Sequence, residues 1–449
     1  MTYGRDDASG AHRRHSKHSV PNEQRLAALG DAVNEQTGVK VRRRRGTGRK
    51  FAIAGLVIVL VIAGVIGGSY AYARWRFDRI PKVHVTGEVQ PISGQPFNIL
   101  MIGSDSRVGL SGLAAKQTGA TSGSVSGQRS DVVKIIHVDP NAGTISMISI
   151  PRDTMVTLLA NQSLYGKFNR INVNFGNGPS LLAQTITANF GIPINQTIVV
   201  SFAGLINAAD ALGGVYLDFP YPSWDPESGL RILHPGCQLV TGFQALALTR
   251  SRHFYYNVDH AKVFPVVSSS PQALYDAGWM YDPTSDFGRI ARQNAFLRAM
   301  VDQAKKLYNP LTINAFLSKL PQGITLDQNF SLNELIGLAV RFHSINANAI
   351  QTWTLPTLAV NNTPLGDVLY VDQPATQQLL VNIFGSELKS PADPPPNTAN
   401  VESPPPTVTT TTRPAASLVT TPKKSSATTT TNPTITASSY DPVPCTPAG

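Results

Sequence analysis

Three short polar clusters between residues 97 and 156 each combine an arginine with an aspartate. They lie beside apolar stretches and pair Asp105 with Arg107, Arg129 with Asp131, and Arg152 with Asp153. Carboxylates bind hard divalent cations, and the guanidinium fork binds phosphate oxygens. If the apolar stretches are neighbouring strands, the clusters meet at one edge of a sheet. The residue types therefore indicate a pyrophosphate site.

A purely structural role is the competing interpretation. Arginine and aspartate are common in turns and salt bridges at strand ends, and one such cluster alone would indicate nothing more. With three such clusters within sixty residues, the sequence alone supports a pyrophosphate site and a purely structural role about equally.

The apolar stretches that flank these clusters have the length of strands. Phe97–Ile102, Val132–Val138 and Thr144–Ile150 are predicted strands, and Asp139–Gly143 is a turn signal that makes 132–150 a hairpin. The stretch 108–128 between the first two clusters is rich in Gly, Ser, Ala and Thr. We expect it to be a loop without an element of its own.

Strand and helix signals alternate farther along the chain. The polar stretch 167–178 reads as a loop. The expected elements after it are helices over 179–190, 205–212, 332–342 and 375–384, and strands over 197–201, 215–219, 351–355 and 368–371. This alternation predicts an α/β (mixed α+β) domain whose helices flank a central sheet.

Two further groups of candidate residues lie near helix ends. Thr241 is a predicted N-cap for a helix over 242–249 that leads into Arg250 and Arg252. If the chain is extended there, the two guanidinium groups point to the same side.

A second helix is expected to begin with Asp286 as its N-cap. Arg289 and Gln293 are four residues apart and share one face of this helix. Helix N-termini favour anions, so this end is a candidate phosphate site. A capped helix with solvated arginines is the structural alternative.

The net charge of +10 is unevenly distributed. Residues 1–50 hold 12 Lys/Arg and 5 Asp/Glu, so the remaining residues carry only +3. Residues 51–73 contain no charged side chain and have the length of a bilayer-spanning helix, directly after the basic stretch 42–50. The positive-inside rule predicts a single-pass protein with a cytoplasmic N-terminus and an extracytoplasmic body. A nucleic-acid-binding tail is the weaker alternative for the basic stretch.

Composition also predicts the domain boundaries. We expect a basic disordered cytoplasmic region over 1–50, a transmembrane helix over 51–73, a connector over 74–95, an extracytoplasmic domain over 96–385, and a disordered Pro/Thr-rich tail over 386–449. Residues 391–449 hold 13 of the 33 prolines, and such a segment cannot bury a core.

Cys237 and Cys445 are the two cysteines of the chain. Outside the cytoplasm they could form a disulfide, and the alternative of two free thiols remains open. The sequence contains no CxxC, HExxH or histidine cluster, which makes a zinc site improbable.

The chain resembles the LytR–CpsA–Psr (LCP) family of bacterial envelope phosphotransferases over roughly 96–310. Its motifs occur in the family's order and read FNILMIGSDSR, RSDVVKIIHVDP, SIPRDTMV, KFNRINVNFGNG, ALGGV, GFQALALTRSR and DFGRIARQ. Each is weak alone, whereas seven in order behind one transmembrane segment are specific.

This resemblance implies a fold, a reaction and a set of site residues. Members of the family move a glycan phosphate from a polyprenyl-pyrophosphate carrier to a sugar hydroxyl of peptidoglycan, assisted by Mg²⁺, with Mn²⁺ as a possible substitute. By motif position, Asp105 and Asp131 correspond to metal-binding residues. The pyrophosphate-binding set corresponds to Arg107, Arg129, Arg152, Arg250, Arg252, Arg289 and Gln293. For the catalytic set we expect Arg152, and we expect either Asp153 or Asp286 to accept the proton of the acceptor.

The lipid chain of such a donor needs an apolar tunnel, which helices over 180–190 and 205–212 could line, although ordinary core is their other possible role. The chain departs from the family in two long stretches, 108–128 and 253–285. The second is either a lid or acceptor platform or a tolerated surface excursion.

Three functions from different classes follow. The leading hypothesis is a membrane-anchored ligase of a glycopolymer to peptidoglycan; the glycopolymer would be arabinogalactan in an actinobacterial wall and teichoic acid or capsule otherwise. The alternatives are a non-catalytic protein that binds lipid-linked glycans or regulates wall assembly, and a pyrophosphatase that acts on the same lipid. No nucleic-acid partner is expected.

Overall fold

The computed structural model describes residues 26–27, 29, 32, 47–120, 129–260, 264–265, 270–306, 310–342, 349–396 and 438–447. The chain forms two units, Met1–Tyr70 and Ala71–Gly449, and the predicted site residues all lie in the second. Most of the predicted basic region and of the predicted tail lies outside the described residues.

A mixed seven-stranded sheet organises the second unit. Its strand order is β1-β14-β7-β2-β3-β4-β15. The strands are β1 (Lys82–Val83), β14 (Ile324–Asp327), β7 (Gln196–Val200), β2 (Phe97–Ser104), β3 (Ser130–Asp139), β4 (Thr144–Ile150) and β15 (Gln351–Thr354). The predicted hairpin is confirmed, because β3 and β4 pair antiparallel with Asp139 opposite Thr144.

One face of this sheet forms the main hydrophobic core. Leu100 and Ile135 pack there against Ile186 of α5 (Pro179–Phe190) and Leu380 of α12 (Gln373–Phe384). Alternate residues of a strand point to opposite faces, so the residues between these core positions face the other side. The predicted mixed α+β fold with helices flanking a central sheet is confirmed.

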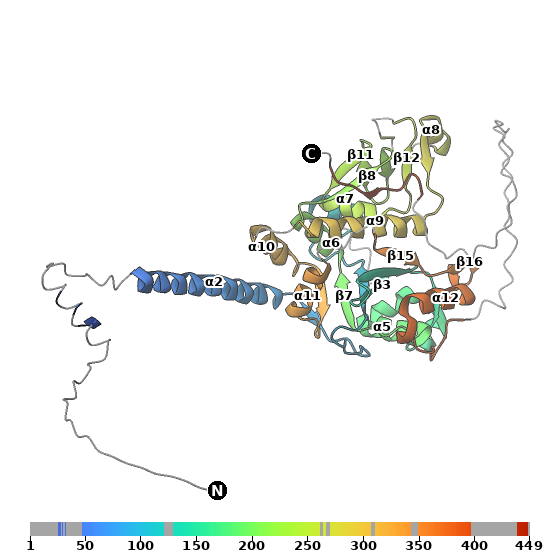
Figure 1. The fold of residues 1–449 in the computed structure, drawn as a ribbon. Coiled ribbons are helices and arrows are strands. Elements are labelled where there is room, and N and C mark those ends of the chain that lie inside the picture. The colour runs from blue at the N-terminus through green and yellow to red at the C-terminus, as the bar shows by residue number, and fades with distance from the viewer. Residues whose placement is uncertain are drawn as a thin grey trace, which may run out of the picture. The chain divides into compact units, whose positions relative to one another are not determined.

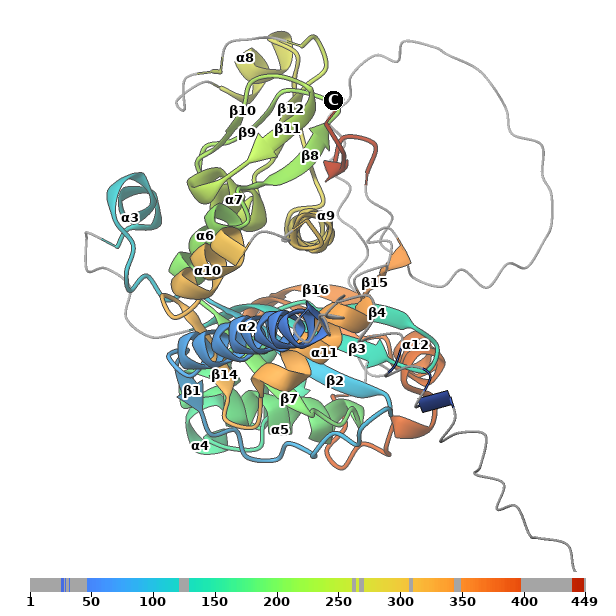
Figure 2. The same cartoon turned by 60° about the vertical axis from the view of Figure 1, so that its left-hand side comes forward.

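Three helices cover the opposite face: α6 (Phe202–Ala211), α7 (Gly242–Arg250) and α9 (Asp286–Ala304). Figures 1 and 2 both show α9 lying between the large sheet and a second group of strands. Helix α9 packs against α7 and against β8 of that second group. It thus joins the two halves of the unit and carries three of the predicted site residues.

The second group contains two small sheets. One has the order β11 (Gly236–Val240), β8 (Val215–Phe219), β18 (Val443–Pro444); the other has the order β10 (Leu230–Ile232), β9 (Ser223–Asp225), β12 (Tyr255–Asn257), β13 (Trp279–Tyr281). The remaining strands form the pairs β5 (Met155–Thr157) with β6 (Phe168–Arg170) and β16 (Thr357–Thr363) with β17 (Gly366–Val371). The remaining helices are α3 (Gly112–Thr118), α4 (Gln162–Tyr165), α8 (Pro271–Asp276), α10 (Pro310–Lys319) and α11 (Leu332–Phe342), with 3₁₀ turns at Ile171–Asn177 and Gly385–Glu387.

Two stretches that the sequence predicts as loops contain short elements. Within 108–128, α3 forms because Gly119 ends it in the left-handed conformation and Ala114 and Ala115 are buried; residues 121–128 lie outside the described part. Within 167–178, β6 pairs with β5, and a 3₁₀ turn follows it. Short elements of this kind have no periodicity to detect, since they are fixed by packing.

The predicted connector and tail also contribute to the folded unit. In the connector, Val85 belongs to the main core and Lys82 pairs with Leu326. In the tail, β18 pairs with β8, and Cys445 forms a disulfide with Cys237. The prediction of a disordered tail is therefore wrong for residues 438–447. It is also wrong for 386–396, where Leu388 packs against the main core and the Lys389 N–H donates to the Gly191 carbonyl. Contacts between residues so far apart, 208 positions in the case of the disulfide, leave no local sequence signal.

The helix α2 (Thr47–Phe77) contains the predicted apolar segment. Within the described residues, its part Gly55–Phe77 is the one helix long and apolar enough to cross a membrane. This window lies four residues later than the predicted span 51–73.

Helix α9 is fixed to the returning C-terminus by a buried charge cluster. Arg292 is fully buried, and its Nη1 lies 2.8 Å from Asp282 Oδ2 and 2.8 Å from Asp441 Oδ1. Its guanidinium also lies 4.3 Å from the ring centroid of Phe254. The structural alternative of solvated arginines on this helix does not hold for Arg292.

We expect Arg292→Ala to lower the free energy of unfolding by about 3–5 kcal/mol, because it leaves two buried carboxylates without their cation. Urea denaturation of the full chain in detergent measures this, with Lys319→Ala on the exposed end of α10 as the control. A loss of less than 1 kcal/mol would contradict the assignment.

Candidate functional site

The three polar clusters meet at one edge of the central sheet, as the strand directions require. Strand β2 ends at Ser104, opposite the start of β3 at Ser130, and β4 ends at Ile150, opposite Val133. In an antiparallel meander the end of the first strand, the start of the second and the end of the third lie side by side. The residues that follow or precede these ends therefore converge.

They line a cleft of about 550 Å³. Its walls hold five arginines and four aspartates: Arg107, Arg129, Arg152, Arg170, Arg252, Asp105, Asp131, Asp153 and Asp367, with Asn172 beside them. The long stretch 108–128 does not separate the first two clusters, because the Arg129 backbone N–H donates to Asp105 Oδ1 at 2.9 Å.

Asp131 connects the strand clusters to α9. Its Oδ1 accepts a 2.6 Å charge-assisted bond from Arg152 Nη1, and its backbone oxygen accepts a bond from Arg289 Nη2 at 3.0 Å. Nearby Asp131, Asp153 and Asp286 raise the pKa of Arg152 against the opposing effect of burial. Arg152 is thus a permanent cation in the wall of the cleft.

The first turn of α9 is an ion-pair cluster. Ser285 holds the N-cap position without a capping bond, and Asp286 is the first helical residue, so the predicted N-cap role of Asp286 is wrong. Asp286 Oδ1 lies 3.2 Å from Arg252 Nε and 2.8 Å from Arg289 Nη2. Asp286 therefore orients two arginines of the predicted set.

Several buried guanidinium nitrogens have no acceptor among the described residues: Nε of Arg107, Nη1 of Arg250 and Nε of Arg289. Arg289 is only 3% exposed, and burial lowers its pKa while Asp286 and Asp131 oppose that shift. An unsatisfied buried donor is costly. Arg107 lines the cleft, whereas Arg250 and Arg289 line the cavity described next, so donors that could bind an anion are present in both.

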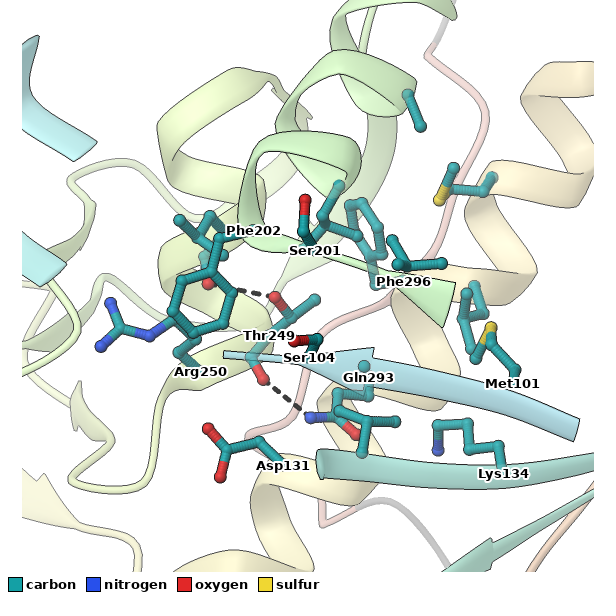
Figure 3. A pocket seen from close by; sticks show the side chains of 18 of the residues that line it. Met101, Ser104, Asp131, Lys134, Ser201, Phe202, Thr249, Arg250, Gln293 and Phe296 are labelled. Carbon is teal, nitrogen blue, oxygen red and sulfur yellow. Dashed lines mark hydrogen bonds between the residues drawn. The ribbon is translucent and has the colours of Figure 1, made fainter. Parts of the chain in front are cut away.

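A second, apolar cavity of about 180 Å³ adjoins the cleft and shares Asp131 with it. Its walls come from the sheet and from α6, α7 and α9, and include Met101, Val132, Val200, Phe202, Leu205, Ala208, Leu246, Phe296 and Met300. Figure 3 shows Asp131 and Arg250 at one end of the cavity, with Met101 and Lys134 at the other.

Of the two helices that could line such a cavity, the one over 205–212 does so through Leu205 and Ala208. The helix over 180–190 does not, because Leu182 and Ile186 pack into the core on the opposite face of the sheet. Ordinary core is thus the role of that helix.

Arg250 and Arg252 do not point to the same side. Arg250 is the last helical residue of α7 and Ser251 is extended, so the chain is not extended through all three residues. Arg250 lines the apolar cavity with its guanidinium 4.9 Å from the Phe202 ring centroid, whereas Arg252 lines the polar cleft. Gln293 also lines the apolar cavity, and its amide donates to the Thr249 carbonyl at 2.8 Å.

The two candidate proton acceptors differ in access. Asp153 lines the cleft and has a quarter of its side chain exposed, with Arg152 Nε at 3.4 Å and Arg170 Nε at 3.3 Å. Asp286 is 14% exposed and held between two arginines. A substrate in the cleft can reach Asp153 more readily.

Asp105 and Asp131 line the same cleft and suit a hard cation. Each engages one carboxylate oxygen, Oδ1, in a described hydrogen bond. Mg²⁺ is commonly bound by one or two carboxylates together with substrate phosphates and water. No group of three or more His, Cys, Asp or Glu ligands occurs among the described residues, so a metal here would need oxygens from the substrate.

Four residues of the site were not predicted from the sequence: Arg170, Asn172, Asp367 and Lys134. Arg170 and Asn172 stand in the motif KFNRINVNFGNG, which reads as a polar loop, and Arg170 bonds to the carbonyls of Leu365 and Asp367. The sequence signal that could have identified these two residues as part of the site was the presence of an arginine and an asparagine inside that motif.

Lys134 is fully buried in β3 without a carboxylate partner among the described residues. Its Nζ donates to Asn294 Oδ1 at 2.7 Å and to Ser149 Oγ at 2.5 Å. Burial, and then the charge of Arg289, lowers its pKa to about 7. A lysine inside the apolar stretch VVKIIHV was the signal for this residue.

We expect Lys134 to make stability depend on pH. Its pKa is about 7 when folded and about 10.4 when unfolded, so the unfolded state binds more protons between these values and stability rises with pH across that window. Lys134→Met should flatten this rise by a few kcal/mol. Urea denaturation at pH 7, 8, 9 and 10 measures it, and parallel curves for the two proteins would contradict the assignment.

Comparisons with known proteins agree on one family. A model of the LytR_cpsA_psr family matches residues 73–263 and 272–383. The interruption at 264–271 lies inside the long stretch 253–285.

Among curated proteins, the chain is 27% identical over 358 residues to a probable cell wall biosynthesis protein, LcpB, of Corynebacterium glutamicum, covering 79% of this chain and 74% of that protein. It is 26% identical over 330 residues to the polyisoprenyl-teichoic acid–peptidoglycan teichoic acid transferase TagV of Bacillus subtilis, covering 70% and 72%. Among solved structures, it is similar in fold to a LytR-Csp2A-Psr enzyme from Actinomyces oris, with a TM-score of 0.50, 21% identity, and coverage of 70% of this chain and 98% of that one.

Proposed function

The chain belongs to the LytR_cpsA_psr family, and from this membership and its site we propose that it is a membrane-anchored glycopolymer–peptidoglycan transferase. The donor would be a glycopolymer on a polyprenyl pyrophosphate, and the acceptor a sugar hydroxyl of peptidoglycan. Relatives named as polyisoprenyl-teichoic acid–peptidoglycan teichoic acid transferases support this assignment.

One observation carries the proposal: the arginine-rich cleft and the apolar cavity adjoin at Asp131. A polyprenyl-linked donor has a diphosphate head and a hydrocarbon tail. The cleft offers charge and hydrogen bonds to the head, and the cavity offers an apolar wall to the first part of the tail. A water-soluble diphosphate would have no use for the apolar cavity.

The unsatisfied nitrogens of Arg107, Arg250 and Arg289 would bind the diphosphate together with Arg129, Arg152, Arg252 and Gln293. Asp105 and Asp131 would hold Mg²⁺, or Mn²⁺ in its place, against the phosphate oxygens. The metal would neutralise charge that develops on the transferred and leaving phosphates.

The reaction would be an in-line displacement at phosphorus. The acceptor hydroxyl oxygen forms a bond to the phosphorus that carries the glycan, and the bond from that phosphorus to the bridging oxygen breaks. The polyprenyl phosphate leaves with the electron pair, and the proton of the hydroxyl passes to a carboxylate. The arginines stabilise the charge on the phosphates because they are already oriented and partly desolvated.

We assign the role of proton acceptor to Asp153 and a positioning role to Asp286. Asp153 lines the cleft, whereas Asp286 is mostly buried between Arg252 and Arg289. Asp286 then fixes the two guanidinium groups on the diphosphate.

The same reasoning gives an orientation in the membrane. The basic stretch 42–50 precedes the apolar helix, which favours a cytoplasmic N-terminus. The disulfide between Cys237 and Cys445 supports an extracytoplasmic body, because disulfides persist in oxidising compartments.

A reconstituted transfer assay tests the proposal. The full chain in lipid nanodiscs would receive a radiolabelled polyprenyl-pyrophosphate glycan, Mg²⁺ and peptidoglycan, with arabinogalactan-type and teichoic-acid-type donors in parallel. We expect label to appear on peptidoglycan, and polyprenyl phosphate to be released, only when acceptor is present.

Either of two outcomes would reject it. Equal consumption of donor without acceptor would identify a pyrophosphatase. Retention of intact donor on the protein without turnover would identify a binding or regulatory protein.

A further inference from the structure

The four-stranded sheet β10-β9-β12-β13 presents a row of aromatic side chains that the reaction does not use. Its register places Trp224 opposite Tyr255, and Tyr255 opposite Tyr281. Directly opposed residues on paired strands point to the same face. Three rings from three strands thus form one row across this face.

Only part of the row is covered. Trp224 and Trp279 are buried and pack against Leu274 of α8. Tyr281 is 42% exposed, and Tyr255 is half-buried beside it, with their ring centroids 5.2 Å apart. The ring of His253 lies 6.4 Å from that of Tyr281. We call the open part, formed by Tyr255, Tyr281 and His253, the aromatic shelf.

The shelf has a polar rim. His253 Nδ1 lies 2.9 Å from Glu227 Oε2, and the Glu227 side chain is 69% exposed. Burial and the charges of Asp225 and Glu227 raise the pKa of the Tyr255 hydroxyl, so it remains a neutral hydrogen-bonding group. Apolar ring faces edged by hydroxyl, imidazole and carboxylate groups suit a ligand that is itself half apolar and half hydroxylated.

Sugar rings have this character. The C–H faces of a pyranose are apolar and carry slight positive charge, which the negative face of an aromatic ring attracts, while the hydroxyls project from the edge. Tyrosine offers such a face at a low cost in conformational entropy. The rings of the shelf are also held by strand pairing, so little ordering is needed on binding.

Two short connections join the shelf to the reacting cleft. His253 directly follows Arg252, which lines the cleft. Tyr281 is followed by the segment 282–285, which leads directly to Asp286, the partner of Arg252. His253 is thus the chain neighbour of a cleft residue, and Tyr281 is five positions before Asp286, so short segments join the shelf to the residues of the cleft. The cleft itself would hold the diphosphate and the sugar attached to it, so a surface outside the cleft would serve the substrate that arrives from solution.

We propose that the aromatic shelf binds the glycan strand of the peptidoglycan acceptor and aligns its hydroxyl with the cleft. This inference rests on the proposed transfer function and adds a location for its second substrate.

The test is a binding titration that needs no turnover. Soluble, uncrosslinked peptidoglycan glycan strands would be titrated into the full chain in nanodiscs without donor. We expect Tyr281→Ala to raise the Kd for these strands roughly three- to tenfold, and Tyr281→Phe, which keeps the ring, to change it less than twofold. Tyr275→Ala, which removes an exposed tyrosine of α8 outside the shelf, serves as the matched control and should leave the Kd unchanged.

Steady-state kinetics separate the two substrates. In Tyr281→Ala and His253→Ala the KM for acceptor should rise while the KM for donor stays constant. A rise in donor KM alone would assign the shelf to the donor glycan and overturn the proposal, as would an unchanged Kd in Tyr281→Ala or an equal effect of Tyr275→Ala.

The two proposals fail in different ways. If glycan strands bind in a way that depends on Tyr281 but no transfer occurs, the transferase proposal is wrong and the proposed role of the shelf stands. If transfer occurs and the KM for acceptor is the same in wild type and Tyr281→Ala, the transferase proposal stands and the proposed role of the shelf is wrong.

Discussion

Replacement of Arg152 by alanine is expected to lower kcat/KM for glycan transfer by about 10³–10⁵, the range found when a charge-stabilising arginine is removed from a phosphoryl-transfer site. Arg152 lines the cleft, 2.6 Å from Asp131, where its guanidinium can oppose the charge that develops on the phosphates. Its side chain is 22% exposed, so the fold should tolerate the truncation.

Two controls make this result specific. Arg152→Lys keeps the charge but loses the fork that binds two phosphate oxygens, and should recover only part of the activity. Lys319→Ala removes the same charge at an exposed position on α10 and should have no effect. Wild-type transfer in a folded Arg152→Ala variant would refute the role of Arg152.

Replacement of Asp131 by asparagine is expected to have an effect of similar size. It removes a proposed metal ligand and also the anchor of Arg152, while the isosteric amide keeps the shape of the site. The Mg²⁺ concentration for half-maximal activity should rise at least roughly tenfold, since even the loss of an outer-shell partner costs that much.

Metal binding can be read without turnover. Mn²⁺ titrations followed by electron paramagnetic resonance should show weakened binding in both Asp105→Asn and Asp131→Asn when a diphosphate is present. Asp367 lines the same cleft and has no proposed role in metal binding, so Asp367→Asn is the matched control. Unaltered Mn²⁺ binding in Asp131→Asn would contradict the proposal that Asp131 is a metal ligand.

The strands of the meander could be predicted from the sequence because their signals are local. Thr144–Ile150 was predicted with the bounds that the structure gives, since the turn at 139–143 fixes where the strand begins. The convergence of Asp105, Asp131 and Arg152 then followed from the alternating strand directions alone.

What depends on distant contacts could not be predicted in this way. Arg289 and Arg292 stand three residues apart on one helix, yet Arg289 lines the apolar cavity and bonds to Asp131, whereas Arg292 is buried against Asp282 and Asp441. The partner Asp441 belongs to a Pro/Thr-rich segment whose composition indicates an extended tail. The return of this segment to β8 brings Asp441 to Arg292.

The apolar cavity illustrates the same limit. Both candidate helices are apolar, and sequence alone does not say which face of the sheet each will cover. Helix α6 covers the face that carries Met101 and Lys134, whereas α5 covers the face of Leu100 and Ile135.

The central claim is that one diphosphate binds among these arginines while its lipid enters the adjoining cavity. A crystal structure of the full chain, bound to a short polyprenyl diphosphate and Mg²⁺, tests it most directly. We predict phosphate oxygens within hydrogen-bond distance of Arg152 and Arg289, and the first isoprene units against Phe202 and Phe296. Density for the diphosphate at any other surface, with the cleft filled by water, would contradict the account.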